Sequence, residues 1–189
     1  MKNVKNILVE VGALLEGHFV LTSGRHAAQY MQCAKILQWP EHTEDIAEDL
    51  AEAFEDDDVD LVVSPAVGAI VLGYELARHL DCRAIFCERE QGKMTLRRGF
   101  EIPRGARVLV CEDVVTTGGS VREVMEVVRA AGGEVVGIAL LVDRSGGAVD
   151  FGVKKVAAYT TAIESYEPGD CPLCKENKLP AIKPGSRSN

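Results

Sequence analysis

The chain has 189 residues, of which 47% are hydrophobic and 26% charged, and this composition predicts one ordinary globular domain. With 21 Lys and Arg against 29 Asp and Glu, the net charge is −8, which argues against non-specific binding to nucleic acid or to a membrane surface. No apolar run approaches the roughly 20 residues that cross a bilayer. Because the N-terminal residues also lack a signal-peptide core, we expect a cytoplasmic protein.

The first part of the chain predicts two helices around a mixed segment. Apolar side chains recur at helical spacing over residues 2–15, so a helix is expected there. Residues 19–33 are rich in hydroxyl groups and predict short strands or loop. A second helix is expected from Pro40 to about Phe54, and the acidic run 55–58 then ends it as a solvated turn.

From residue 59 the sequence alternates between strand and helix patterns. Strands are expected at 61–64, 83–87, 107–111, 135–142 and 155–160, and helices at 70–80 and 120–131. Continuous β-branched runs joined by helices are typical of a buried parallel sheet. We therefore predict an α/β fold with helices on both faces of the sheet and ligands at the carboxyl ends of its strands.

Residues 108–120 carry the strongest functional signal. A buried strand up to Cys111 leads into two acids, Glu112 and Asp113, then into a turn rich in hydroxyls and glycines, and finally into a helix. Backbone N–H groups and the helix dipole favour an anion at such a turn, and two carboxylates suit the hydroxyls of a sugar. Since no Walker lysine is present, a single phosphate is favoured. The residues predict recognition of ribose 5-phosphate, with a plain strand-to-helix turn as the alternative.

The run Cys111-Glu-Asp-Val-Val-Thr-Thr-Gly-Gly-Ser120 resembles the phosphoribosyl-pyrophosphate (PRPP) signature of the type I phosphoribosyltransferases. The resemblance implies that the acid pair holds the ribose hydroxyls and that the turn binds the 5-phosphate. It also implies a single domain over residues 1–189, with a small N-terminal hood over about 1–40 and a C-terminal tail at 168–189. The implied PRPP-binding residues are Glu112, Asp113, Val114, Val115, Thr116, Thr117, Gly118, Gly119, Ser120, Arg89 and Lys93.

A second strand-to-helix turn, Ser64-Pro-Ala-Val-Gly-Ala-Ile70, extends the resemblance. In the family such a turn lines the pyrophosphate of PRPP. Here its backbone amides would do so, at the positions Ala66, Val67, Gly68 and Ala69. A turn of this composition also occurs in many strand-to-helix connections without a ligand.

The basic segment 88–99 lies between two expected strands and is long for a connection. Its cations are Arg89, Lys93, Arg97 and Arg98. We expect a lid that neutralises the departing pyrophosphate, with a solvated surface hairpin as the alternative. The catalytic residues that the resemblance implies are Lys93, Arg89 and Asp113.

Residues 19–30 and 141–147 are similar to segments of the orotate phosphoribosyltransferases. Because a guanidinium matches a carboxylate with two parallel hydrogen bonds, Arg144 is the candidate for the orotate carboxylate. Tyr30 and Thr116 complete the implied orotate site. The implied reaction converts orotate and PRPP into orotidine 5-phosphate and pyrophosphate, with Mg²⁺, in a homodimer whose lid is shared between subunits. A purine-base acceptor and a PRPP-sensing regulator without turnover are the alternatives.

Four histidines and the pair Cys171-Pro-Leu-Cys174 remain unassigned. The histidines share no ligand spacing, and His26 is expected near the base or at the surface. Since a structural zinc ion needs four ligands and the sequence displays only two, reduced thiols in an extended or mobile tail are expected. A metal half-site and a redox pair stay open as alternatives.

Overall fold

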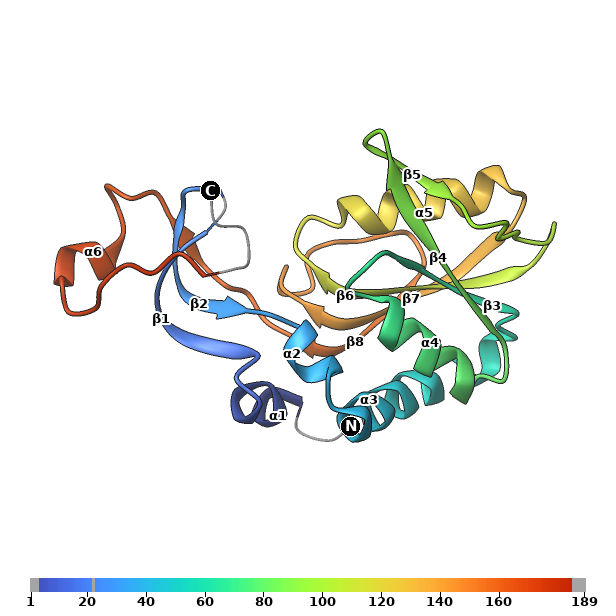
Figure 1. The fold of residues 1–189 in the computed structure, drawn as a ribbon, viewed down its shortest axis with the longest axis horizontal. Coiled ribbons are helices and arrows are strands. Elements are labelled where there is room, and N and C mark those ends of the chain that lie inside the picture. Colours follow the sequence, from blue (N-terminus) through green and yellow to red (C-terminus); the bar gives the residue numbers. More distant parts are fainter. Residues whose placement is uncertain (1–3, 22, 185–189) are drawn as a thin grey trace.

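The computed structural model describes residues 4–21 and 23–184, which form a large sheet domain with a smaller lobe beside it (Figure 1). The helices are α1 (Val4–Glu10), α2 (Ala34–Leu37), α3 (Pro40–Glu52), α4 (Ile70–His79), α5 (Gly119–Ala130) and α6 (Pro172–Glu176), with a 3₁₀ turn η1 (Glu55–Asp57). The strands are β1 (Leu14–Val20), β2 (His26–Met31), β3 (Leu61–Pro65), β4 (Arg83–Glu90), β5 (Lys93–Leu96), β6 (Arg107–Val115), β7 (Glu134–Asp143), β8 (Lys154–Thr160) and β9 (Ser165–Tyr166). Within the part of the chain described, no helix is long and apolar enough to cross a membrane.

The large sheet has the strand order β5-β4-β3-β6-β7-β8. Its strands pair in parallel except for β5, which lies antiparallel at one edge. Successive side chains of β3 face opposite sides: Leu61 and Val63 pack with α5, whereas Val62 packs with α3 and α4. Because both faces are covered, the strands are continuous apolar runs, and the predicted α/β fold is confirmed (Figure 1).

The strand order reverses at β3, and this reversal positions the site. The chain passes from β3 through α4 to β4 on one side, and later places β6 on the other side of β3. The loops after β3 and β6 therefore lie next to each other at the carboxyl ends of the strands, where α/β folds bind ligands. Their contact is close, since a Cβ atom on Gly68 would lie 2.4 Å from Oδ2 of Asp113.

The smaller lobe, which we call the hood, joins both ends of the chain. Its antiparallel sheet has the order β1-β2-β9, so that the late strand β9 pairs with the early strand β2. The C-terminal segment then runs along β1, where Ile182 N–H donates to His18 O and Val20 N–H donates to Ile182 O, both at 2.8 Å. Of the tail expected to be extended or mobile, residues 172–176 are instead helical, and the segment around Ile182 is extended and bonded to the hood. Residues 185–189 lie outside the described ranges.

The predicted first helix ends earlier than expected. Gly12 adopts a φ of 67°, and its N–H donates to Val9 O at 3.0 Å while Ala13 N–H donates to Leu8 O at 2.8 Å. These two bonds form a Schellman motif, which stops a helix at a glycine in the left-handed region. The expected helix at 13–15 is therefore wrong, because Leu14 already begins β1.

Candidate active site

The turn between β6 and α5 surrounds a polar cavity of about 220 Å³. Gly118 precedes α5 with a φ of 78°, and a Cβ there would lie 2.8 Å from the Phe151 ring, so only glycine fits. The first turn of α5 carries no acidic residue and lines the cavity with its N-terminal backbone, which suits an anion. The implied PRPP-binding residues that line it are Arg89, Glu112, Val114, Val115, Thr116, Thr117, Gly118, Gly119 and Ser120.

A second cavity of about 280 Å³ lies beneath the loop after β3. Ala66 and Gly68 line it, whereas Val67 is exposed and Ala69 is fully buried, so the structure brings two of the four expected loop residues to this cavity. Asp113 also lines it. The residues that line both cavities are Arg89, Glu112, Val114 and Ser120. The two cavities are therefore parts of one crevice.

The acid pair stands between the two cavities, at the end of β6, which continues to Val115 rather than stopping at Cys111. Asp113 N–H donates to Glu112 Oε1 at 3.1 Å, and Val114 N–H donates to Asp113 Oδ1 at 2.9 Å. Burial, together with the neighbouring Asp113, raises the pKa of Glu112 to about 9. This shift favours the uncharged carboxyl of Glu112, which can both donate and accept hydrogen bonds.

This raised pKa predicts a pH-dependent effect of Glu112→Gln on stability. The folded state holds a proton that the unfolded chain, with a pKa near 4.5, releases. The contribution of this proton to wild-type stability is then fully present below that pH, and it is lost as pH rises toward about 9. Gln cannot ionise at this position. The unfolding free energy of the variant minus that of wild type should therefore rise by up to about 1.4 kcal/mol per pH unit across neutrality.

Urea unfolding at several pH values measures this gain. Glu126→Gln, at an exposed position on α5, is the matched control and should keep a constant difference from wild type. A constant difference for Glu112→Gln as well would mean that Glu112 carries an ordinary charge.

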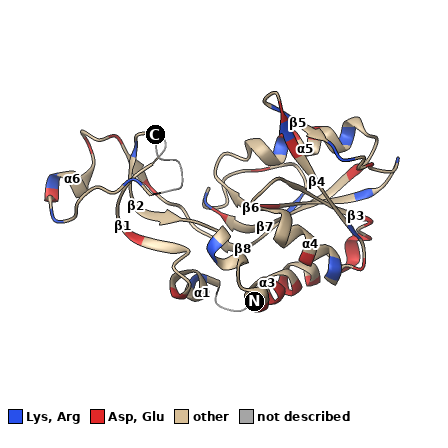
Figure 2. Cartoon of the chain, in the orientation of Figure 1, with Lys and Arg blue, Asp and Glu red and all other residues tan. Residues whose placement is uncertain are grey.

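The basic segment 88–99, which is expected to act as a lid, folds as a hairpin. Strands β4 and β5 pair antiparallel across Gln91 and Gly92, whose φ values are 49° and 83°. Positive φ at both turn positions gives a type I′ turn, the form that suits tight hairpins. Figure 2 shows basic and acidic segments close together near β5, so charges of both signs occupy this hairpin.

The cations of the hairpin differ in their partners. Arg89 pairs with Glu123 at 2.6 Å, and the other two arginines pair with glutamates of the hairpin itself at 3.3 and 2.8 Å. Lys93 has no ion pair within residues 4–21 and 23–184, and it faces a separate cavity beside α5 that Glu126 also lines. The structure thus brings Arg89 to the crevice of its own chain and leaves Lys93 outside it.

Arg144 lies at the end of β7, next to the crevice. Its N–H donates to Val115 O at 2.8 Å, and its buried Nε has no hydrogen-bond partner among the described residues. Burial lowers the pKa of Arg144, while Cys33 and Tyr30 are close enough to oppose that shift. A buried donor without a partner is costly unless a ligand satisfies it. The strand end and the hood therefore meet around a guanidinium that can receive an anion.

Cys33 is a site residue that the sequence did not indicate. Its Sγ lies 3.7 Å from the backbone oxygen of Asp113, and burial, followed by Asp113, raises its pKa strongly. The uncharged thiol joins the hood to the acid pair. The sequence signal for Cys33 as a site residue was its position just after β2. That strand supplies Tyr30, whose ring lies 5.8 Å from that of Phe19.

Comparisons with known proteins agree with this geometry. Residues 32–160 match the phosphoribosyl transferase domain family. A relative from Caldicellulosiruptor bescii, named orotate phosphoribosyltransferase, is 57% identical and covers 94% of this chain and 93% of its own. A relative of the same name from Thermotoga maritima is 50% identical and covers 97% of this chain and 98% of its own.

Solved structures of related enzymes superpose on the same fold. The orotate phosphoribosyltransferase from Aeropyrum pernix has a TM-score of 0.68 at 29% identity, covering 83% of this chain and 93% of that one. The adenine phosphoribosyltransferase from Rhodothermus marinus has a TM-score of 0.59 at 25% identity, covering 70% and 86%. The chain therefore belongs to the type I phosphoribosyltransferase family, in its orotate phosphoribosyltransferase branch.

Proposed function

We propose that this protein transfers ribose 5-phosphate from PRPP to N1 of orotate, a step of pyrimidine nucleotide (UMP) synthesis. The observation that carries the proposal is the crevice at the β3–β6 reversal, with the unpartnered Arg144 beside it. One end offers the N-terminus of α5 to a phosphate, and the other offers the loop with Gly68 to a pyrophosphate. Identities of 50–57% with proteins named orotate phosphoribosyltransferase support orotate over a purine base as the acceptor.

In the proposed complex the acid pair orients the sugar. Glu112, uncharged, and Asp113 would bind the two ribose hydroxyls, so that the anomeric carbon faces the hood. Tyr30 and Thr116 would hold the orotate ring, while Arg144 pairs with its carboxylate. Holding both reactants in one orientation removes much of the entropic barrier of a bimolecular reaction.

The reaction breaks the bond between the anomeric carbon and the pyrophosphate oxygen and forms a bond to N1 of orotate. Negative charge develops on the leaving pyrophosphate, and the guanidinium of Arg89, which lines both cavities, is positioned to stabilise it. Lys93 of the partner subunit would add a second cation when that subunit's hairpin closes over bound substrate, and closure would also exclude the water that hydrolyses PRPP.

The crevice suits the Mg²⁺ that the family implies. Asp113 lines the cavity beneath the β3 loop, and its carboxylate oxygens are the kind of ligand that Mg²⁺ shares with substrate phosphates. When bound, the ion neutralises and aligns the pyrophosphate oxygens. The carboxylate of Asp113, packed against Gly68, would approach those oxygens only through the ion, because a carboxylate and a pyrophosphate repel each other in direct contact.

We further propose a homodimer in which Lys93 serves the crevice of the partner subunit. The position of Lys93 outside its own crevice, and its lack of an ion pair among the described residues, support this arrangement. Arg89 stays with its own chain, so each complete site would combine cations from two subunits. A cytoplasmic location remains a prediction from the sequence.

A product assay tests the proposal against a regulator that binds PRPP without turnover. Purified protein with PRPP, Mg²⁺ and orotate should release pyrophosphate and orotidine 5-phosphate in equal amounts. PRPP binding without any release of pyrophosphate would favour the regulator.

A further inference from the structure

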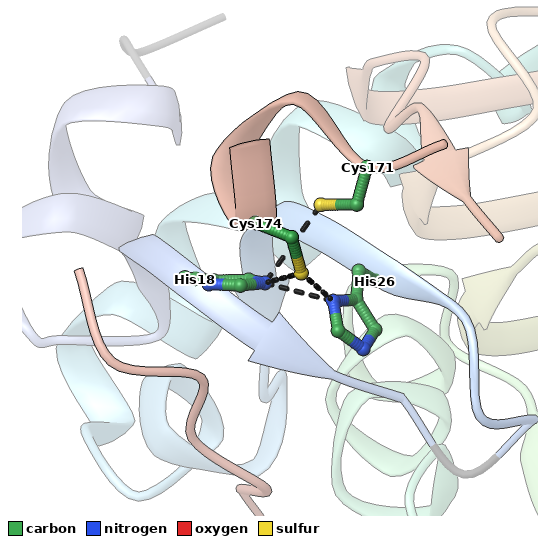
Figure 3. A group of neighbouring side chains, drawn as sticks. All are labelled: His18, His26, Cys171 and Cys174. Carbon is green, nitrogen blue, oxygen red and sulfur yellow. Dashed lines mark hydrogen bonds between the residues drawn. The ribbon is translucent and has the colours of Figure 1, made fainter. Parts of the chain in front are cut away.

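Four side chains that the proposed reaction does not use converge inside the hood. His18 comes from β1, His26 from β2, and Cys171 and Cys174 from the start of α6 (Figure 3). Each offers one nitrogen or sulfur atom, and these four atoms all lie within 4.8 Å of one another. His18, His26 and Cys171 are buried, whereas Cys174 is exposed at the edge of the cluster. The expected surface role of His26 is therefore wrong.

The separations of these atoms are close to those of a tetrahedral metal site. His18 Nε2 lies 2.8 Å from His26 Nδ1, and Cys174 Sγ lies 3.6 and 3.2 Å from the same two nitrogens. Cys171 Sγ lies 3.8 Å from His18 Nε2. Zn–N bonds of about 2.0 Å and Zn–S bonds of about 2.3 Å place tetrahedral ligand atoms roughly 3.3–3.8 Å apart. The cluster needs only small adjustments to surround one ion.

The hydrogen bond on the far side of His18 fixes which nitrogen faces the cluster. His18 Nδ1 lies 3.2 Å from the backbone oxygen of Leu179, which can only accept, so Nδ1 carries the proton. Nε2 then presents a lone pair to the cluster. A carbonyl that orients a histidine in this way is the usual second partner of a metal-binding imidazole.

Hydrogen bonding alone accounts poorly for this arrangement. The single lone pair of His18 Nε2 faces three groups at once, namely the His26 nitrogen and both sulfurs. One lone pair accepts one good hydrogen bond, so the remaining groups would compete for it. A cation uses the lone pairs of all four atoms together, and two thiolates balance the charge of a divalent ion.

We propose that His18, His26, Cys171 and Cys174 bind one structural zinc ion that fastens the C-terminal segment to the hood. Two imidazoles and two thiolates form a closed Cys₂His₂ set, which suits Zn²⁺ and leaves no position for a substrate. Two residues separate Cys171 from Cys174, and this spacing is common between the cysteine ligands of zinc sites.

The sheet of the hood is small. It is a three-stranded sheet in which β9 contributes two residues, and small sheets are marginal without additional support. The ion joins residues 153 positions apart in the chain, His18 and Cys171. Because β2 continues from His26 to Tyr30, the ion would also hold the strand that supplies the proposed base site.

Metal analysis of the purified full-length chain tests the site. Protein prepared under reducing conditions, with any affinity tag removed, should contain about one zinc ion per chain by mass spectrometry. Cys174→Ser should lose most of this zinc and lower Tm by roughly 5–10 °C. The matched control Cys82→Ser, at a half-buried cysteine outside the cluster, should keep the zinc.

Cobalt replacement gives a second measurement, which does not depend on a variant that folds. Wild-type protein stripped by a chelator and loaded with Co²⁺ should show thiolate-to-cobalt charge-transfer and tetrahedral d–d absorption, and Zn²⁺ should restore its Tm. Reduced wild type that holds no zinc, shows no such absorption and keeps its Tm with added Zn²⁺ would overturn the proposal. A disulfide between Cys171 and Cys174 in protein isolated from the cytoplasm, detected by intact mass, would also overturn it. These readouts are independent of orotate turnover.

Discussion

Lys93→Ala is expected to lower kcat by about 10² or more, because it removes a cation that meets the developing charge of pyrophosphate. The KM values should change less, since the interaction forms mainly in the transition state. Lys5→Ala, an exposed lysine on α1, is the control and should leave both constants unchanged. An unchanged kcat in a folded Lys93→Ala protein would remove this residue from the mechanism.

Mixing two inactive variants tests whether Lys93 acts across the dimer. Lys93→Ala keeps an intact crevice, and Asp113→Asn keeps an intact hairpin. If the lysine serves the partner, one of the two sites in each mixed dimer is complete, and an equal mixture should recover about one quarter of wild-type activity. If Lys93 serves its own chain, every mixed dimer lacks a complete site, and the mixture should stay inactive.

Arg144→Ala is expected to raise the KM for orotate by about 10² while the KM for PRPP changes little, because a charge-assisted bidentate bond is lost. The free protein should not lose stability. The buried Nε of Arg144 has no hydrogen-bond partner among the described residues, so the substitution removes an unsatisfied donor rather than a hydrogen bond.

Steady-state kinetics and thermal unfolding of the same preparation check both parts. Arg144→Lys should restore only part of the orotate affinity, since an ammonium cannot pair with both carboxylate oxygens. Equal increases in the two KM values, or a large fall in Tm, would indicate a structural role for Arg144.

The large sheet could be predicted well because its strands are buried on both faces. The strands expected at 61–64, 135–142 and 155–160 differ from the observed ones by one or two residues at the ends. The apolar spacing predicts too long a first helix, because Leu14 and Leu15 continue that spacing beyond Gly12, where the helix ends. A local glycine signal decides the end of a helix even where the hydrophobic pattern continues.

The phosphate end of the site was predictable because its residues are contiguous in the chain. One run, Glu112 to Ser120, forms most of the cavity, and the reversal at β3 brings the loop with Gly68 to it. The position of Lys93 was not predictable, because it depends on the angle of the hairpin rather than on its composition. For the same reason, the sequence does not show that Arg89 lines the crevice and Lys93 does not; only the structure distinguishes the two positions.

The hood was the least predictable part. β9 and α6 are short, and the contacts of β9 with β2 and of α6 with His18 join segments about 150 residues apart. Sequence spacing reveals metal ligands only where they lie close together in the chain, as Cys171 and Cys174 do. The two histidines gave no such signal, since each belongs to a different strand of the hood.

A base-panel assay with PRPP and Mg²⁺ tests the central claim most directly. The purified protein would be given orotate, adenine, guanine, hypoxanthine and xanthine separately, and kcat/KM would be measured for each. A buried guanidinium that pairs with a carboxylate should make kcat/KM for orotate about 10³ or more above that for each purine, since no purine in the panel carries a carboxylate. Turnover of a purine base with none of orotate would contradict the assignment.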